Sequence, residues 1–158
     1  MSQAIRTSQR CVATTLAGAR CKNRTARGTK CWVHLKKENG LRVKTSGVAG
    51  MGLFTTKKRK KKKQVATYQG ETLTKQQVSA RYGNRTGQYV LCRNNRNECR
   101  DARKTTAGVA RFANDPRGTG KRANVKFSGY SVKTTKSVKP GDELLVSYRG
   151  GGYWSKSG

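Results

Sequence analysis

The sequence predicts a mostly β protein in two parts, and three observations lead to this prediction. Short runs of β-branched and aromatic residues, broken by glycines, recur after residue 40. Only one segment carries the start and stop signals of a helix. The first 37 residues contain no acid, yet they hold three of the five cysteines and the sole histidine. We therefore expect a small zinc-stabilised module over residues 5–37 and a larger β domain over residues 40–154, separated at "KKENG".

The first part is predicted to bind a structural zinc ion through Cys11, Cys21, Cys31 and His34. Nine residues separate each cysteine from the next, and two residues separate Cys31 from His34. Three thiolates and one imidazole fill the tetrahedral shell of structural zinc. A segment with so little apolar content needs a metal to fold. The alternative is that these are buried thiols with an unrelated histidine, but it does not explain why the three cysteines and the histidine occur so close together in the sequence. The segment is similar to short Cys-Cys-Cys-His motifs of some viral and eukaryotic proteins, which suggests binding or targeting.

In the larger part, the expected elements are short strands and one helix. Strands are expected at 65–70, 87–92, 123–132 and 142–148. The helix is expected over 72–83, with Thr74 as its N-cap, Gln77 completing a capping box and Gly83 at its end.

The charge balance predicts polyanionic partners. The chain has 36 Lys+Arg and 7 Asp+Glu, a formal net charge of +29, so nucleic acid is the first expected partner and an anionic membrane surface the second. The basic run 57–63 is interpreted as a solvated hairpin tip that can also serve as a nuclear-import or nucleic-acid patch. No apolar run approaches the roughly 20 residues of a membrane span, and no signal-peptide pattern is present. We expect a soluble intracellular protein without a membrane partner.

Cys92 and Cys99 flank the segment "RNNRNE" and remain outside the zinc motif. An odd number of cysteines without a secretory signal favours reduced thiols or metal ligands over disulfides. A second metal site would need two more ligands. We therefore expect buried or hairpin thiols at these positions.

Four motifs in the larger part occur in a fixed order. They are "GVAGMGLFTT" (47–56), "VATYQGE" (65–71), "CRDARKTTAGVARFANDP" (99–116) and "KSVKPGDELLVSYRGGGYW" (136–154). In this order they resemble the SET domain, the β-rich fold of protein-lysine methyltransferases that use S-adenosylmethionine. The resemblance covers roughly residues 41–154. It implies a knot-like C-terminal crossing in which the segments around 110–116 and 141–148 meet at one site.

The resemblance also implies roles for individual residues. Tyr148 would be the catalytic tyrosine, whose hydroxyl holds the lysine amine and stabilises the polarised methyl group, and Tyr68 would be a second tyrosine of the lysine channel. The cofactor would be contacted by Gly50, Met51, Gly52, Arg111, Asn114, Asp115 and Trp154.

Three departures from the family pattern accompany the match. Asp115 stands where the family has histidine. Val146 stands where many members carry a larger aromatic residue, so the channel is expected to leave room for di- or trimethylation. Arg59 and Lys61–Lys63 replace an expected apolar residue and glycine.

These features together predict an S-adenosylmethionine-dependent protein-lysine N-methyltransferase. Its expected substrate is a basic, lysine-containing segment, first of all a histone in chromatin, and its expected location is the nucleus. The compact size suggests a viral or protist protein, which would place it in a host nucleus or virion. The alternative is a catalytically inactive SET-fold protein that binds or packages nucleic acid. A third reading is methylation of another basic protein, including this chain at residues 57–63.

Overall fold

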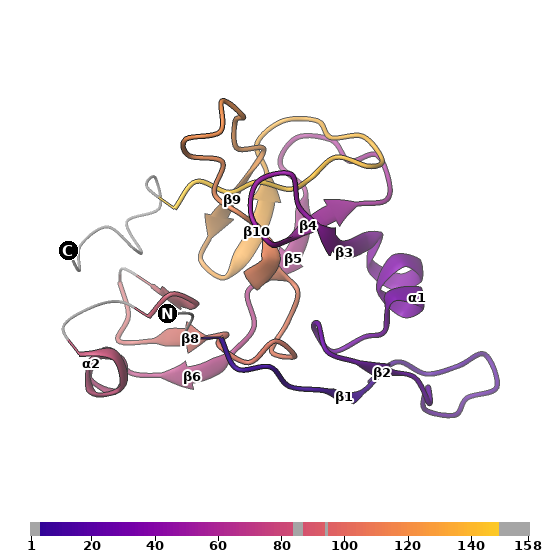
Figure 1. The fold of residues 1–158 in the computed structure, drawn as a ribbon, viewed down its shortest axis with the longest axis horizontal. Helices are drawn as coiled ribbons and strands as arrows, with labels where there is room; N and C mark the ends of the chain where they lie inside the picture. The colour runs from indigo at the N-terminus through magenta and orange to yellow at the C-terminus, as the bar shows by residue number, and fades with distance from the viewer. Residues whose placement is uncertain (1–3, 84–86, 94, 149–158) are drawn as a thin grey trace.

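The computed structural model describes residues 4–83, 87–93 and 95–148. It consists of small antiparallel sheets joined by short loops, with little helix (Figure 1). The N-terminal elements lie at one end of the molecule and the α2 region lies at the other, with the remaining sheets between and above them (Figure 1). The mostly β class predicted from the sequence is confirmed. No helix among the described residues is long and apolar enough to span a membrane.

The N-terminal module has very little regular structure. Strands β1 (Gln9–Arg10) and β2 (Arg24–Thr25) pair antiparallel, and α1 (Trp32–His34) runs into the π-helix η1 (Leu35–Asn39). Gly40 ends η1 with φ 63°, a left-handed conformation that favours glycine. The buried cluster of this module consists of Cys11, Ala13, Cys21 and Cys31. Its interior is therefore made mostly of thiols.

The module is attached to the segment that follows β8. Ile5 N donates to Arg103 O at 2.7 Å, and Thr105 N donates back to Ile5 O at 2.9 Å. The hydroxyls of Thr7 and Thr106 lie 2.6 Å apart. Further along the module, Gly28 N also donates to Thr105 O. The N-terminal segment thus hydrogen-bonds to the loop that leads to residues 110–116.

Two sheets form the centre of the larger part. One contains β3 (Leu41–Thr45) paired with β4 (Met51–Thr55), and the other contains β5 (Gln64–Thr67), β10 (Ser131–Thr134) and β9 (Val125–Ser128) in the order β5-β10-β9. The strand expected at 123–132 is therefore a hairpin. It turns at Gly129, whose φ of 60° suits glycine.

The basic run 57–63 joins β4 to β5, but it is not the tip of a hairpin. Those two strands belong to different sheets, and the run instead pairs with the last residue of β10 and with the segment that follows it. Arg59 forms an antiparallel bridge with Val138, and Lys62 N donates to Thr134 O at 2.9 Å. The guanidinium of Arg59 donates to Asn39 O at 2.6 Å, so this arginine has a structural role within the run.

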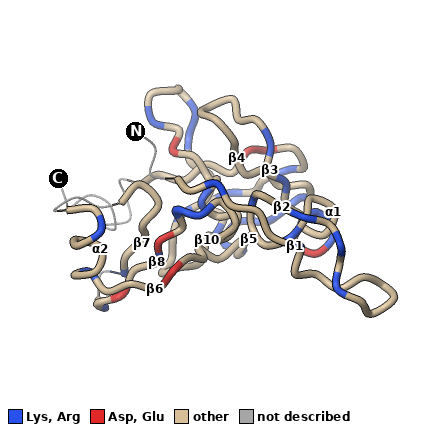
Figure 2. Tube along the Cα trace, turned by 60° about the horizontal axis from the view of Figure 1, so that its bottom comes forward, with Lys and Arg blue, Asp and Glu red and all other residues tan. Residues whose placement is uncertain are grey.

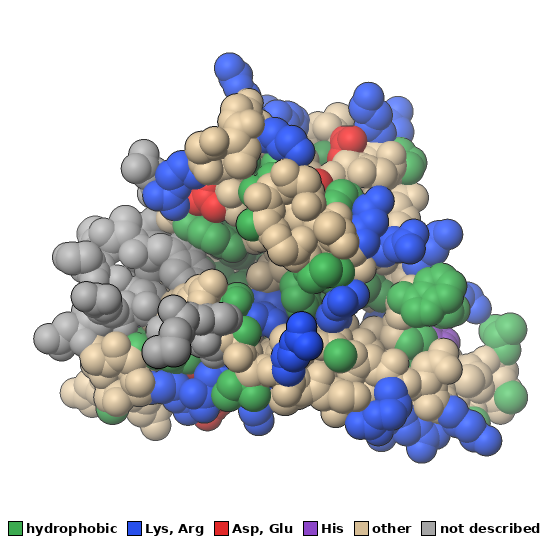
Figure 3. Space-filling view, viewed as in Figure 1, with side chains coloured by type: hydrophobic (Ala, Val, Ile, Leu, Met, Phe, Trp, Pro, Cys, Tyr) green, Lys and Arg blue, Asp and Glu red, His purple; other side chains and the backbone are tan. Residues whose placement is uncertain are grey.

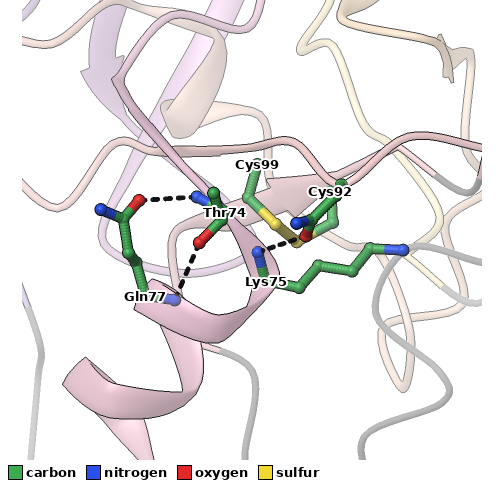
Figure 4. The surroundings of a disulfide bond; sticks show 6 residues. Thr74, Lys75, Gln77, Cys92 and Cys99 are labelled. Atoms are coloured by element: carbon green, nitrogen blue, oxygen red, sulfur yellow. Dashed lines mark hydrogen bonds between the residues drawn. A yellow bond between two sulfur atoms is a disulfide. The ribbon is translucent and has the colours of Figure 1, made fainter.

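The third sheet carries the predicted helix. It has the order β6 (Glu71–Leu73), β8 (Cys99–Asp101), β7 (Val90–Cys92), and α2 (Lys75–Tyr82) follows β6. The capping box is confirmed: Gln77 N donates to Thr74 Oγ1 at 3.1 Å, and Thr74 N donates to Gln77 Oε1 at 2.8 Å (Figure 4). Helix α2 begins directly after its predicted N-cap Thr74 and ends before Gly83, while the first two residues of the predicted range, 72–73, belong to β6.

The expectation that Cys92 and Cys99 are thiols is wrong, because they form a disulfide (Figure 4). The two residues are directly opposite each other on β7 and β8. Arg93 N donates to Glu98 O just beyond them, so Cys92 and Cys99 form a non-hydrogen-bonded pair, the more closely spaced kind. Cross-strand pairing therefore supplies the proximity that spacing along the chain did not reveal.

Residues 141–148, where the described part of the chain ends, lie between several elements and form no regular strand. Bridges join Glu143 to Phe54, Leu145 to Asn114 and Val146 to Val125. The strand expected over 142–148 is thus replaced by isolated bridges, because successive residues pair with different partners. The bridges bring the segment beside residues 113–114, as the SET resemblance implies, while the knot-like threading itself stays a prediction. The fully buried side chains of the central core include Leu41, Leu53, Leu91, Leu144, Val125, Val132 and Val146.

Candidate functional site

The two predicted catalytic tyrosines meet around the ring of Phe127. Phe127 lies 5.8 Å from Tyr68 in an edge-on arrangement and 6.1 Å from Tyr148 in a stacked one, centroid to centroid. The hydroxyl of Tyr68 donates to Tyr89 O at 2.6 Å, and that of Tyr148 donates to Ala113 O at 2.6 Å. Both rings are therefore fixed in position by packing and by a backbone acceptor.

Both tyrosine hydroxyls stay protonated at neutral pH. Burial raises the pKa of Tyr148, and the nearby Asp115 carboxylate raises it further. The pKa of Tyr68 is also raised, mainly by burial and then by Tyr148. Burial alone would raise the pKa of Asp115, but the backbone N–H groups of Arg117 and Tyr148 and the Arg117 guanidinium outweigh it and lower that pKa. Neutral phenols beside a carboxylate can orient a ligand by hydrogen bonds, but they are poor proton acceptors.

Arg111 places a buried cation beside the two tyrosines. Its side chain is on the 3-10 helix η2 (Ala110–Phe112) and the residue is 8% exposed. The guanidinium lies 4.0 Å from the centroid of Tyr89 and 4.9 Å from that of Phe112. Its Nε and Nη1 have no hydrogen-bond partner among the described residues. Unpaired buried N–H groups are unfavourable by about 1–3 kcal/mol each, so this arginine is suited to an acceptor supplied by a ligand.

Asn114 connects the glycine loop to the C-terminal segment. Its Nδ2 donates to Ala49 O at 2.9 Å and to Met51 O at 3.0 Å, and lies 3.4 Å from Glu143 Oε2. The backbone carbonyl of Asn114 accepts from Val146 N at 2.9 Å. Asn114 thus holds the predicted cofactor loop against the segment that ends in Tyr148, the predicted catalytic tyrosine.

The glycines of this loop are required by backbone conformation and by close approach. Gly50 has φ 49°, in the left-handed region, and a Cβ on Gly52 would overlap the Glu143 carboxylate. Ser46 Oγ donates to Glu143 Oε2 at 2.6 Å and accepts from Val48 N at 2.8 Å. Glu143 is therefore the anchor of the loop.

Most of the predicted site residues come together in one region. Direct contacts, shared neighbours such as Phe127 and Glu143, and charge interactions bring together Tyr68, Tyr148, Arg111, Asn114, Asp115, Met51 and Gly52. The Asp115 carboxylate joins this group by accepting a hydrogen bond from Tyr148 N at 3.1 Å. Trp154 lies outside the described residues, so its predicted role over the cofactor stays a prediction.

Three residues of the site were not singled out from the sequence. Phe127 separates the two tyrosines, Tyr89 lies under Arg111, and Glu143 anchors the glycine loop. Phe127 alternates with the buried Val125 on β9, a period-2 pattern that could have indicated an inward-facing side chain. No local pattern distinguishes Tyr89 from other strand tyrosines.

A second candidate site lies in the N-terminal module. The ligand atoms of Cys11, Cys21, Cys31 and His34 all lie within 4.8 Å of one another. The three cysteines are buried, and His34 Nδ1 lies 3.3 Å from Cys31 Sγ. This is the group predicted from the spacing, and it could hold a metal ion.

The surroundings of the thiols favour a thiolate at Cys31. Burial alone would raise the pKa of Cys31, but the His34 N–H, the Asn23 side chain and the imidazole outweigh it and lower the pKa to about 6. Asn23 donates from N to Cys21 Sγ at 3.4 Å and from Nδ2 to Cys31 Sγ at 3.6 Å. Such N–H groups aimed at sulfur stabilise ligating thiolates.

The fold and the two sites define a small β-rich domain that follows a Cys3His module. The model of the SET domain family matches residues 50–149, and the chain belongs to this family. Members of the family are generally S-adenosylmethionine-dependent lysine methyltransferases, so the fold is of a methyltransferase type. A search among curated proteins found no match. The division into parts at 5–37 and 40–154 stays a prediction.

Proposed function

We propose that this chain is a protein-lysine methyltransferase that transfers a methyl group from S-adenosylmethionine to the side-chain amine of a lysine. The observation that carries the proposal is the convergence of Tyr68 and Tyr148 on Phe127, beside Arg111 and Asn114. These positions come from widely separated segments, and SET-family membership makes their meeting a candidate catalytic centre.

The residues of this region suit S-adenosylmethionine, which supplies an electrophilic methyl group on a positively charged sulfur. Arg111 has two buried N–H groups that are unpaired within the described part of the chain and that are suited to a carboxylate. The carbonyls of Ala49 and Met51, held by Asn114, offer acceptors for an ammonium group. The cofactor's amino-acid end would be held by these residues.

The tyrosines would position the lysine amine rather than remove its proton. Burial keeps the Tyr148 hydroxyl protonated, and its proton is donated to Ala113 O. The hydroxyl oxygen can therefore accept a hydrogen bond from the amine, whose own proton leaves to water. The buried Arg111 cation near the same rings would lower the pKa of an arriving ammonium group. Alignment of amine and methyl by fixed rings accounts for a large part of such rate enhancements.

We propose that the Cys3His group binds a structural zinc ion. All four positions are protein ligands, which leaves no open position for catalysis. The metal ion, instead of apolar packing, would then hold the thiol-rich interior of the module together. Zinc binding would also order the residues of the module that hydrogen-bond to the loop after β8.

The proposed substrate is a lysine in a basic protein segment, first of all in a histone bound to DNA in the nucleus. The proposal rests on the family's chemistry and on the net charge of +29. A cationic enzyme repels a free cationic tail, whereas DNA that binds both would bring them together. We expect faster methylation of nucleosomes than of free histones.

The test is methyl transfer from labelled S-adenosylmethionine to nucleosomes by the zinc-loaded full chain. Tyr148→Phe is expected to lower the rate about 10²–10³-fold. Tyr130→Phe is the matched control, because Tyr130 is a buried tyrosine whose ring faces the Arg100 guanidinium. Equal rates for Tyr148→Phe and wild type, with both folded, would refute the assignment of Tyr148. If added DNA leaves turnover on histones unchanged or lowers it, the targeting proposal is wrong.

The second candidate function is nucleic-acid binding or packaging by an inactive SET fold, favoured by the charge of +29. Calorimetric titration with S-adenosylmethionine separates the two. Absence of binding heat from a folded sample supports the packaging function. Mass spectrometry of the purified chain tests the third reading: methyl-lysines within 57–63 that disappear in Tyr148→Phe would establish self-methylation.

A further inference from the structure

The N-terminal module exposes apolar side chains that the proposed zinc site and methyl transfer do not use. The exposed large hydrophobic residues of the described chain are Ile5, Val12, Leu16, Trp32 and Val33. All belong to this module. Trp32, on α1, is 71% exposed, although tryptophan is usually among the most buried side chains on average. Trp32 and Val33 line one groove together, and an exposed apolar patch of this kind marks an interaction surface.

Trp32 separates two shallow grooves, and both are lined by cations. One groove is lined by Trp32 together with Lys36, Lys37 and Lys57. The other is lined by Trp32 together with Arg24, Arg27 and Lys30. Figure 3 shows a hydrophobic patch over the α1 region with Lys and Arg side chains beside it, and Figure 2 shows basic residues recurring along this part of the chain. We call these seven residues the Trp32 surface.

Almost no negative charge opposes these cations. Glu38 is the only acidic residue in the first 70 positions of the chain. It lies 3.7 Å from Lys30 Nζ, and that lysine also donates to Asn39 Oδ1 at 3.0 Å. Five of the six cations lining the grooves therefore have no carboxylate partner in this part of the sequence. The surface is complementary to a polyanion.

We propose that the Trp32 surface binds single-stranded nucleic acid, with Trp32 stacking on an unpaired base and the flanking cations contacting phosphates. A single strand alternates anionic phosphates with planar bases, which matches an aromatic side chain between two cationic grooves. A duplex keeps its bases stacked inside, so Trp32 could not reach them. An acidic peptide would supply charge but no recurring planar group. This inference does not depend on the proposed methyl transfer.

The test measures binding of a short labelled single-stranded oligonucleotide to the zinc-loaded full chain. Trp32→Ala is expected to weaken binding about 5- to 150-fold, which corresponds to the 1–3 kcal/mol of one stacked base. Trp32→Phe retains a ring and is expected to keep most of the affinity. Leu16→Ala is the matched apolar control, because Leu16 belongs to the same module, is 96% exposed and lies outside both grooves. It should bind like wild type.

Two further measurements separate stacking from charge. In a Trp154→Phe background, where Trp32 is the only remaining tryptophan, a stacked base should quench the tryptophan emission. Replacing Lys36 and Lys37 by glutamate should reduce the slope of log affinity against log salt by about 1.4, from two lost phosphate contacts. The same replacement at Lys126 and Lys133, cross-strand neighbours on β9 and β10, should change affinity less.

Several outcomes would overturn the proposal. These are unchanged single-strand affinity in Trp32→Ala, equal or tighter binding of a duplex of the same length, and equal competition by polyglutamate. Self-association through this surface, lost in Trp32→Ala, would also overturn it. Because Trp32 is exposed, Trp32→Ala should alter stability by no more than about 0.5 kcal/mol, which zinc content and thermal unfolding will check. If Trp32→Ala loses zinc, the Trp154→Phe protein decides: quenched Trp32 emission supports stacking, and unquenched emission refutes it.

Discussion

Reduction of the Cys92–Cys99 disulfide should destabilise the protein by an amount that the loop size predicts. The two cysteines are seven positions apart, so the bond closes a loop of about eight residues, which corresponds to about 2.5 kcal/mol of lost unfolded-state entropy. For a chain of this length that equals a decrease in Tm of about 5–10 °C. The same loop contains Asn97, whose Oδ1 accepts from Lys75 N at the start of α2 at 2.9 Å. Reduction should therefore also speed amide exchange at Lys75.

The assay is thermal unfolding at saturating zinc, with and without reductant. The Cys92→Ala/Cys99→Ala variant is the control, because its Tm should not respond to reductant. Thiol titration of the unfolded, metal-free and unreduced chain should find three reactive thiols out of the five cysteines. Five thiols would show that the bond does not form. A wild-type Tm that stays constant while mass spectrometry confirms reduction would refute the magnitude worked from the loop.

Three other predictions concern stability. Lys62 has φ 67°, so Lys62→Gly should stabilise the protein by about 0.5–1 kcal/mol in chemical denaturation, because glycine adopts this backbone conformation without strain. Lys60→Gly should give no such gain, and equal effects of the two substitutions would contradict backbone strain at Lys62. The Asp101 side chain is fully buried and pairs with Arg81 at 2.8 Å, so Asp101→Ala should destabilise by about 3 kcal/mol, and a loss under 1 kcal/mol would contradict the buried pairing. Burial and Asp101 raise the pKa of Tyr82 to about 12, so the stability that the protonated phenol contributes is complete below about pH 10 and is lost as pH rises toward 12. In Tyr82→Phe the free energy of unfolding should fall less over this pH range, and a pH profile identical to that of wild type would refute the prediction.

Local signals predicted those features whose causes are local. The capping box at Thr74 and Gln77 needs only residues of one turn, and the Cys3His group follows from spacing within the module. The hairpin at Gly129 and the irregular C-terminal segment depend on partners far along the chain, so strand composition alone predicted them wrongly. The disulfide has the same origin, since register on β7 and β8 places its cysteines opposite each other.

The candidate site was predictable only through the order of its motifs. Tyr68 and Tyr148 are ordinary strand-end tyrosines when considered alone, and their proximity comes from the packing of Phe127 between them. Glu143 stands in an expected motif, but its contact with Ser46 joins two distant segments. Side chains that support a site from another element leave little trace in their own neighbourhood of sequence.

The placement of the acids bears on how a basic substrate could bind. The acidic side chains that pair with the protein's own cations or hydrogen-bond donors include Glu38, Glu71, Asp101, Asp115, Asp142 and Glu143, and the Tyr130 hydroxyl is a partner of Glu98. Asp115 and Glu143, the two nearest the candidate site, are engaged with Arg117 and Ser46. A cationic peptide therefore meets few free carboxylates and a strongly positive field, whose reach at physiological salt is about 8 Å. Attraction must come from a polyanion that neutralises both partners, so for such a substrate nucleic-acid binding would precede methylation. The Trp32 surface offers a place for that first contact on a part of the chain distinct from the tyrosines.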